Sequence, residues 1–237
     1  MTRPQKAAER FVSLLPGEIR AGLSVVYSPL IGIEPTASEI NFGDARGLIF
    51  TSANAVEVTA ALSHHRGLPS FCVGQATTRA AIAAGWTGQY SGENSEALIK
   101  TLHQSRPMGP LLHIRGTHSR GNVALRLSAS GCPTREQVVY DQPLLSFSDI
   151  AEKSLTRPAP IVVPLFSPRT ARQFANLVTG SENLHFAALS DAVAEQVKPL
   201  KFNQLKVSKA PNARSMAQLV SQMINDAIWV EGGKPAQ

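Results

Sequence analysis

The sequence predicts an α/β protein of two related domains, each with a parallel β-sheet, joined by a two-stranded bridge. Short apolar runs of strand length alternate with helix-like segments along almost the whole chain, which is the pattern of parallel sheets covered on both faces. The same order of strand, polar turn and helix occurs twice. Two extended, proline-marked segments separate the parts of the chain in which it occurs.

The first half of the chain alternates strands and helices. Strands are expected where three or four apolar residues stand together, and helices where a polar turn precedes a longer periodic stretch. Gly85 can end one helix, because glycine adopts the left-handed conformation that terminates helices. In order, we expect a strand at 48–50, a helix at 53–64, a strand at 71–73, helices at 76–84 and 94–103, a strand at 111–114, a helix at 120–129 and a strand at 137–140.

The second half repeats this alternation by the same criteria. We interpret Asp191 as the N-cap of a helix, since Asp is a preferred capping residue. The tail, residues 231–237, contains Gly, Lys and Pro and is expected to be disordered. In order, we expect a strand at 161–163, a helix at 168–178, a strand at 186–189, a helix from 191, a strand at 205–207 and a helix at 213–227.

An internal repeat indicates that the two halves are related. Phe50 precedes a polar turn into a helix, and Gly74 follows 24 positions later. Phe166 also precedes such a turn, and Ser190 follows 24 positions later. Each half then continues with a polar turn and a further helix. Matched spacings of this kind favour two similar α/β units over one large domain.

Two segments are typical of connectors between the units. They lie at about 28–35 and 139–146, and both are partly apolar and contain proline. A residue before proline is restricted to extended geometry. We therefore expect a short two-stranded bridge rather than a flexible linker.

Charge and composition limit the partners. The chain has 23 Lys and Arg against 17 Asp and Glu, a net charge of +6, which favours anionic partners. The basic residues stand singly and are not interleaved with aromatic residues, so we expect no nucleic-acid partner. No apolar run reaches about 18 residues, so no membrane span is expected. Residues 1–6 lack the apolar stretch of a secretory signal, and a cytoplasmic location is the default expectation.

The sequence contains none of the usual cofactor or catalytic signatures. A dinucleotide loop, a Walker loop, an H-E-x-x-H helix and a nucleophile elbow are all missing. The histidines do not fall at metal-ligand spacings. Cys72 and Cys132 stand in or beside apolar segments, which is typical of buried thiols rather than of a disulfide or a metal site. We expect neither a cofactor nor a metal.

Polar turns at the starts of helices are the remaining candidates for chemistry. Backbone N–H groups and the positive end of the helix dipole make such turns suitable for anions. Ser, Thr and Asn at these positions are also ordinary N-caps, so each turn taken alone has a purely structural explanation. The candidate turns follow residues 50, 73, 166 and 189.

The most polar turn runs from His113 to Gly121. Its arginines, Arg115 and Arg120, could bind carboxylates bidentately, and its glycines would allow the backbone to approach a ligand. An exposed basic loop is the alternative. Tyr140 ends an apolar strand, where a phenol could face a cleft or could pack in a core.

Taken in order, these segments resemble the uroporphyrinogen-III synthase family over essentially the whole chain. The Phe-Thr-Ser-Ala-Asn-Ala-Val segment that starts at Phe50 is the most specific of them. The matching segments are Thr2-Arg3-Pro4, residues 29–35, residues 48–56, residues 73–77, Arg115-Gly116 with Arg120, Val138-Val139-Tyr140 and Phe166-Ser167-Pro168.

The resemblance implies a discontinuous first domain of residues 1–30 plus 147–237 and an inserted second domain of residues 36–139. It implies a monomeric, cyclising lyase that needs no cofactor. The substrate would be the polycarboxylate hydroxymethylbilane, which hydroxymethylbilane synthase could hand over. Tyr140 would help the substrate hydroxyl to leave. The implied substrate-binding residues are Thr51, Ser52, Asn54, Gly74, Thr77, Arg115, Gly116 and Ser167.

Two departures from the family and one rival function accompany this resemblance. The family usually has an apolar strand before Thr-Arg-Pro, whereas only Met1 stands there; either the start is misassigned or the strand is shortened. The turn at Ser190-Asp191 lacks the threonine that the family often has. The rival is a non-enzymatic two-domain sensor of a small anion, which would share the repeat, the bridge and the turns.

Overall fold

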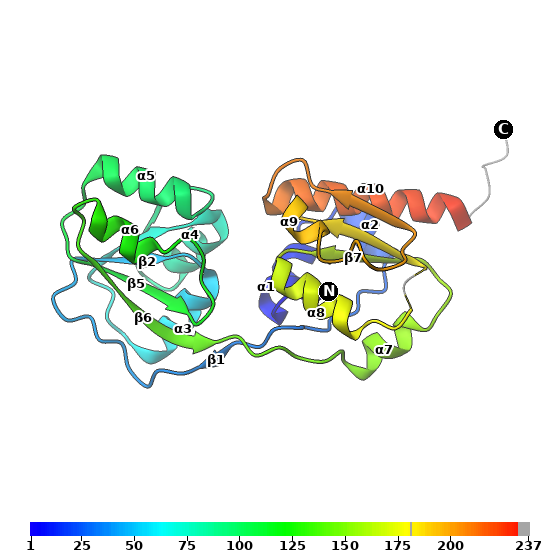
Figure 1. Ribbon diagram of the computed structural model, residues 1–237, viewed down its shortest axis with the longest axis horizontal. Helices are drawn as coiled ribbons and strands as arrows, with labels where there is room; N and C mark the ends of the chain where they lie inside the picture. Colours follow the sequence, from blue (N-terminus) through cyan, green and yellow to red (C-terminus); the bar gives the residue numbers. More distant parts are fainter. Residues whose placement is uncertain (181, 232–237) are drawn as a thin grey trace. The chain divides into compact units, whose positions relative to one another are not determined.

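The computed structural model describes residues 1–180 and 182–231 (Figure 1). The chain divides into two compact units: unit 1 comprises Met1–Gly32 and the segment from Leu144 onward, and unit 2 comprises Ile33–Pro143. Each unit is an α/β layer structure with a largely parallel sheet, which confirms the predicted fold class. No helix among the described residues is both long and apolar enough to cross a membrane.

Unit 2 contains a six-stranded sheet of order β1-β6-β5-β2-β3-β4. All neighbouring strands are parallel except β1 and β6, which are antiparallel. The central strand β2 is buried along its whole length, as expected of a strand covered on both faces. The strands are β1 (Glu34–Pro35), β2 (Gly47–Phe50), β3 (Pro69–Cys72), β4 (Thr87–Tyr90), β5 (Leu111–Gly116) and β6 (Thr134–Asp141).

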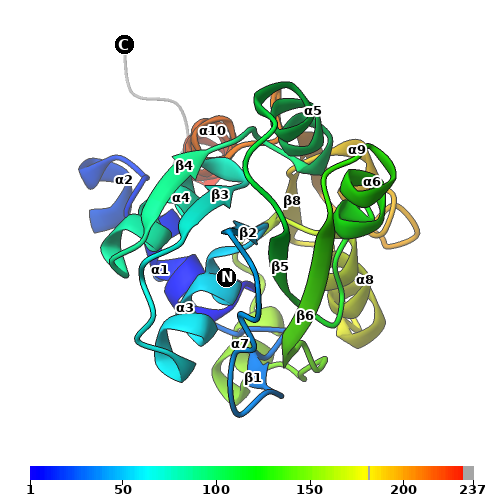
Figure 2. The ribbon, with the colours of Figure 1, turned by 90° about the vertical axis from the view of Figure 1, so that its left-hand side faces the viewer.

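Helices cover both faces of this sheet, because successive strand residues point to opposite faces. Leu112 and Ile114 pack with α3 (Ala53–Leu62) and α4 (Gly74–Ala83). Leu111 packs on the other face with α5 (Ser95–Ser105) and α6 (Val123–Ala129). Figure 2 shows α5 and α6 on one side of the unit 2 strands and α3 on the other.

Unit 1 contains a smaller parallel sheet of order β7-β8-β9. Phe186 on β8 is fully buried and packs edge to face against Phe174 of α8, with ring centroids 5.6 Å apart. Ala187 faces the opposite side, where it packs with α1 and α10. The strands are β7 (Ile161–Leu165), β8 (Leu184–Ala188) and β9 (Gln204–Val207); the helices are α1 (Gln5–Val12), α2 (Gly17–Ala21), α7 (Asp149–Leu155), α8 (Pro168–Leu177), α9 (Asp191–Ala194) and α10 (Ala213–Glu231).

The two chain segments that connect the units pair with each other. Ile31 and Leu144 form an antiparallel bridge, and the Leu145 N–H donates to the Leu30 carbonyl at 3.0 Å. Beyond it, β1 pairs with the end of β6, with Pro35 opposite Tyr140. The connection is therefore two-stranded, as the proline-marked segments predicted.

Several elements differ from the sequence-based expectation. Helices α1, α2 and α7 and strand β4 were not expected; β4 is a short, mostly exposed edge strand without an apolar run. Helix α6 begins at Val123 rather than at residue 120, because Gly121 and Asn122 adopt left-handed conformations. The N-cap of α9 is Ser190, so the interpretation of Asp191 as the cap was wrong; only Ser190 has the extended backbone of a cap.

Other predictions concern the chain ends and the cysteines. Residues 1–3 form no strand, although the Met1 and Thr2 carbonyls accept hydrogen bonds from the Ser28 and Leu30 N–H groups at 2.8 and 3.0 Å. The predicted disordered tail lies outside the described residues apart from Glu231, which ends α10. Cys72 is buried and Cys132 is half-buried, and neither forms a disulfide.

Candidate functional site

The candidate site in unit 2 lies at the carboxyl ends of β2, β3, β5 and β6. Parallel strands place their carboxyl ends at the same edge of a sheet, where α/β proteins bind ligands. The turn after β2 supplies Thr51 and Ser52, which are both half-buried. Ser52 is the N-cap of α3 and accepts a hydrogen bond from the Asn54 backbone N–H at 3.2 Å. Ser52 therefore caps α3 through its oxygen, which leaves one further acceptor position and the hydroxyl hydrogen for other partners.

Tyr140 is the partner of Ser52. Their side chains are hydrogen-bonded, and burial raises the pKa of the Tyr140 phenol while this bond partly lowers it. Tyr140 is 3% exposed because its ring packs directly over Gly116 on β5; a Cβ at Gly116 would lie 2.5 Å from two ring carbons. Tyr140 is thus a protonated, packed phenol that reaches the turn after β2.

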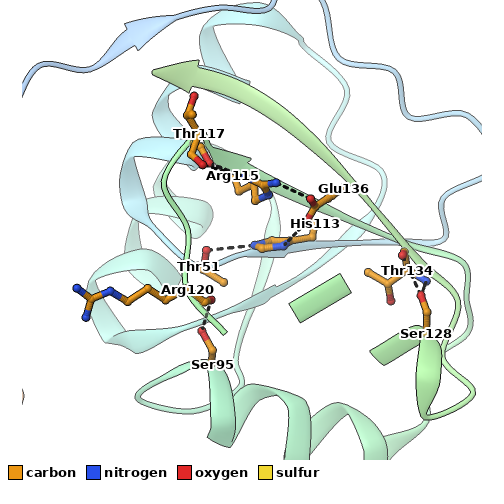
Figure 3. A network of polar contacts seen from close by, with 10 residues as sticks. Thr51, Ser95, His113, Arg115, Thr117, Arg120, Ser128, Thr134 and Glu136 are labelled. Carbon is orange, nitrogen blue, oxygen red and sulfur yellow. Dashed lines mark hydrogen bonds and ion pairs between the residues drawn. The ribbon is translucent and has the colours of Figure 1, made fainter. Parts of the chain in front are cut away.

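A second polar group lies beside this turn, on the face of the sheet that carries α5 and α6. The Thr51 hydroxyl is 3.2 Å from Nε2 of His113, and the His113 Nδ1 is 3.9 Å from a carboxylate oxygen of Glu136 (Figure 3). Arg115 is ion-paired with the same carboxylate. Four side chains, from β5, β6 and the turn after β2, therefore form one continuous polar chain.

Electrostatics fix the charges in this chain. Burial lowers the pKa of His113 to about 4, with smaller opposing effects of Glu136 and Arg115, so the imidazole is neutral at neutral pH. The hydrogen bond from Arg115 lowers the pKa of Glu136, so that carboxyl group is ionised. His113 is 1% exposed. A neutral, buried imidazole therefore lies beside an ion pair.

Arg115 itself is engaged by groups of unit 2. Its guanidinium bonds Glu136 and also donates to the carbonyls of Gly116 and Thr117, at 3.0 and 3.2 Å. A carboxylate ligand would have to compete with these partners. The Arg115 Nε has no partner among the described residues.

The turn after β3 supplies Gly74 and Thr77. Gly74 has a left-handed backbone with φ of 75°, which favours glycine, and it is the first residue of α4. The N-cap, Val73, provides no side-chain cap, so the first backbone N–H groups of α4 have no side-chain acceptor there. Thr77, in the first turn of α4, is 5% exposed and therefore buried. Gly74 is the more accessible of the two predicted residues.

Ser167 belongs to unit 1 and follows β7. Its Oγ accepts from the Thr170 N–H at 3.1 Å and lies 2.8 Å from the Thr170 hydroxyl. Phe166, one residue earlier, has the guanidinium carbon of Arg3 4.2 Å above its ring. Burial lowers the pKa of Arg3 to about 10. The turn after β7 therefore combines a capped helix start with a partly buried cation.

The structure thus assembles eight of the nine predicted residues at one edge of unit 2. Two members of the polar chain, His113 and Glu136, were not among the residues predicted from the sequence. His113 could have been predicted, because it lies two residues before Arg115 on the same strand and the two side chains therefore share a face. Glu136 is directly opposite His113 in the β5–β6 register, but this pairing can be read only from the structure.

The described residues contain no cluster of three or more His, Cys, Asp or Glu side chains that could hold a metal ion. The chemical groups at the site are hydroxyls, an amide, a phenol, an imidazole, a guanidinium paired with a carboxylate, and backbone N–H groups. Such a set can bind anionic and hydrogen-bonding groups and can position them. It contains no activated nucleophile of the serine or cysteine hydrolase type.

Comparison with known proteins gives a consistent result. A sequence model of the family described as uroporphyrinogen-III synthase HemD matches residues 15–218. No curated protein matches this sequence significantly. The uroporphyrinogen-III synthetase of Helicobacter pylori is similar in structure, with a TM-score of 0.63 and 15% identity, over 86% of this chain and 97% of that one. A mutant uroporphyrinogen III synthase of Thermus thermophilus aligns with a TM-score of 0.49 and 12% identity, over 95% of this chain and 100% of that one.

At 15% identity the Helicobacter structure shows a shared fold, and the family match extends that likeness to sequence. The match includes both units, the polar turns and the whole of the connection between residues 28 and 35. It does not favour the rival interpretation as an anion sensor. The chain belongs to the uroporphyrinogen-III synthase family.

Proposed function

We propose that this member of the uroporphyrinogen-III synthase family binds hydroxymethylbilane through the polar turns described above. The family reaction makes the chain a cyclising lyase of tetrapyrrole biosynthesis. The single observation that best supports the proposed site is the cluster at the carboxyl edge of unit 2, where Ser52, Gly74, Gly116 and Tyr140 follow or end neighbouring strands. Helix starts there offer N–H donors to substrate carboxylates, and the net charge of +6 favours a polyanion.

The proposed reaction begins with loss of the terminal hydroxyl of the bilane as water, which leaves an azafulvene electrophile. The substituted carbon of ring D attacks it and gives a spiro intermediate. This intermediate fragments and closes again with ring D inverted, and a proton is lost to give uroporphyrinogen III. Closure without the enzyme gives the uninverted I isomer, so the protein must hold the chain near the attack geometry and exclude water from a reactive cation.

In this proposal Tyr140 assists the departure of the hydroxyl. The phenol is protonated, because burial raises its pKa, and it is hydrogen-bonded to Ser52. Since Tyr140 is buried, its proton would reach the leaving oxygen with the Ser52 hydroxyl as the nearest relay. The remaining predicted residues, Thr51, Asn54, Gly74, Thr77, Arg115, Gly116 and Ser167, would bind the substrate.

The test is the isomer composition of the product. Hydroxymethylbilane would be generated in situ by its own synthase, and the oxidised I and III porphyrins would be separated by chromatography. We expect a dominant III isomer that reverts to the I isomer after the protein is boiled. Only the I isomer, formed with folded protein, would contradict the proposed function.

Tyr140→Phe tests the phenol separately. We expect about a tenfold lower rate of III formation, the effect of one lost hydrogen bond of about 1.4 kcal/mol in the transition state. Tyr90→Phe is the matched control, because Tyr90 lies on the edge strand β4, is 42% exposed and bonds only Glu93 among the described residues. Equal rates for the two variants would remove Tyr140 from the mechanism and leave the isomer ratio to decide the function.

We also propose that the protein acts as a monomer in the cytoplasm, on substrate received from hydroxymethylbilane synthase. Light scattering at assay concentrations should give the mass of one chain, and a dimer mass would contradict the monomer.

The handover can be tested with a reaction in solution that consumes free hydroxymethylbilane. This reaction should capture less hydroxymethylbilane when hydroxymethylbilane synthase and this protein are present together, and complete capture would contradict the handover.

A further inference from the structure

The polar chain beside the turn after β2 contains a buried histidine with two different neighbours. Nε2 of His113 is 3.2 Å from the Thr51 hydroxyl, whereas Nδ1 is 3.9 Å from a Glu136 oxygen and has no hydrogen-bond partner among the described residues (Figure 3). His113 is 1% exposed. The direction of the bond to Thr51 therefore depends on which ring nitrogen carries the single proton of the neutral imidazole.

The charge of Glu136 decides between the two tautomers. Arg115 is ion-paired with this carboxylate and keeps it ionised, because the hydrogen bond lowers the Glu136 pKa. A bare Nδ1 would point its lone pair at a negative charge 3.9 Å away, whereas an Nδ1–H would point a positive hydrogen at it. The burial of His113 favours the second arrangement, and it does so although Glu136 itself is 40% exposed and shares its charge with Arg115. The favoured tautomer therefore has the proton on Nδ1 and a lone pair on Nε2.

With a lone pair on Nε2, the hydroxyl of Thr51 must be the donor of the 3.2 Å bond. A hydroxyl has one hydrogen and two acceptor positions. Once its hydrogen is committed to His113, the Thr51 oxygen can only accept hydrogen bonds from a ligand. Such an oxygen repels a carboxylate and attracts an N–H group.

We propose that His113 is a positioning residue that turns Thr51 into a dedicated hydrogen-bond acceptor for a pyrrole N–H of the substrate. This inference rests on the proposed function. It proposes that Thr51 and the helix starts bind different parts of the substrate. The helix starts offer donors and suit the carboxylates, while Thr51 offers an acceptor and suits the ring nitrogen. The arrangement Glu136–His113–Thr51 thus distinguishes the edge of a pyrrole from its acidic substituents.

The bond direction can be tested on the free protein. In protein labelled with ¹⁵N-histidine at pH 7, we expect His113 to show a protonated Nδ1 and an unprotonated Nε2. A protonated Nε2 with a bare Nδ1 would overturn the proposal. Glu136→Gln removes the charge and should increase the population of the Nε2–H tautomer. Glu96→Gln is the matched control, because Glu96 is also paired with an arginine of unit 2, Arg126, and should leave the His113 signals unchanged.

The coupling between His113 and Thr51 can be tested by kinetics. Thr51→Val and His113→Phe should each raise KM for hydroxymethylbilane about five- to tenfold, the scale of one hydrogen bond, with kcat changed less than about twofold. The KM of the double variant should not exceed the higher KM of the two single variants, because both changes remove the same interaction. Thr51→Ser, which keeps the hydroxyl, should restore KM to within about twofold. Multiplicative losses in the double variant would overturn the proposal.

The two arms separate failure of this inference from failure of the proposed function. A wild-type protein that forms only the I isomer would remove the proposed function and, with it, the pyrrole as ligand. The tautomer measurement needs no substrate and would still decide the direction of the bond. Should His113→Phe fail to fold, Glu136→Gln combined with Thr51→Val supplies the kinetic comparison, with the same expected lack of additivity.

Discussion

The buried imidazole of His113 should make unit 2 unstable to mild acid. Its pKa is about 4 in the folded protein and about 6.5 for an ordinary histidine. Between these values the unfolded chain binds a proton that the folded chain does not. The free energy of unfolding is therefore highest above pH 6.5, where His113 is neutral in both states, and it decreases as the pH falls toward 4. From pH 8 to pH 5 the expected loss is about 2 kcal/mol, with roughly 3 kcal/mol as the limit at lower pH.

The loss of free energy of unfolding can be assigned to His113 by comparing the wild-type protein with His113→Phe, which has no titratable group at this position. Glu136, whose pKa is lowered, contributes in the same direction but only below about pH 4.5, so measurements down to pH 5 largely avoid it. Urea unfolding would be followed by the fluorescence of Trp86, which is buried in unit 2, in a Trp229→Phe background. In this unit 2 signal, His113→Phe should show a free energy of unfolding nearly independent of pH over this range, because the Met1 amino group, whose pKa burial lowers to about 6, belongs to unit 1.

Two results would refute the reasoning. The first is a loss of stability between pH 8 and pH 5 that is the same, within about 0.5 kcal/mol, with and without His113. The second is an NMR titration of His113 with a midpoint near 6.5, the unperturbed value. Either would mean that the imidazole reaches solvent or is stabilised as a cation.

Three substitutions test the packing around the site. Gly116→Ala should destabilise unit 2 by about 1–3 kcal/mol in urea unfolding, because the new Cβ would meet the Tyr140 ring at 2.5 Å; Gly17→Ala, where nothing lies within 4 Å, is the control. Ser167→Ala should cost about 1 kcal/mol through loss of the α8 cap, and Ser167→Asp should cost less by calorimetry. Phe186→Ala should cost about 3–5 kcal/mol and should lower only the unfolding transition of unit 1, while an unchanged transition would contradict its central place in that core.

The fold was largely predictable because its strands are buried on both faces. Gly47–Phe50, Leu111–Gly116 and Ile161–Leu165 are dominated by apolar residues, and each is followed by a polar turn that begins a helix. Edge elements carry no such signal. Thr87–Tyr90 forms a strand only because its backbone pairs with β3, and its exposed side chains do not distinguish it from a loop.

The candidate site was predictable only in part. The turn residues follow strands of one parallel sheet, so their convergence could be deduced from topology. The burial and the partners of each side chain could not be deduced in this way. Tyr140 was a candidate for an open cleft, but Gly116 on the neighbouring strand leaves space for its ring and buries it. Arg115 was a candidate for a carboxylate clamp, but the register of β6 brings Glu136 beside it.

The two-stranded connection has a consequence for the order in which the protein can fold during synthesis. Unit 2 is contiguous, whereas the first 32 residues of unit 1 pack against strands that are translated after residue 143. At about 5–20 residues per second, the early segment waits roughly 5–20 s for its partners. Unit 2 can complete its sheet in that interval, and a nascent chain stalled after unit 2 has left the ribosome should already protect Trp86 from quenchers. During this interval Phe11, which is buried against α10 in the folded protein, has no core to pack against.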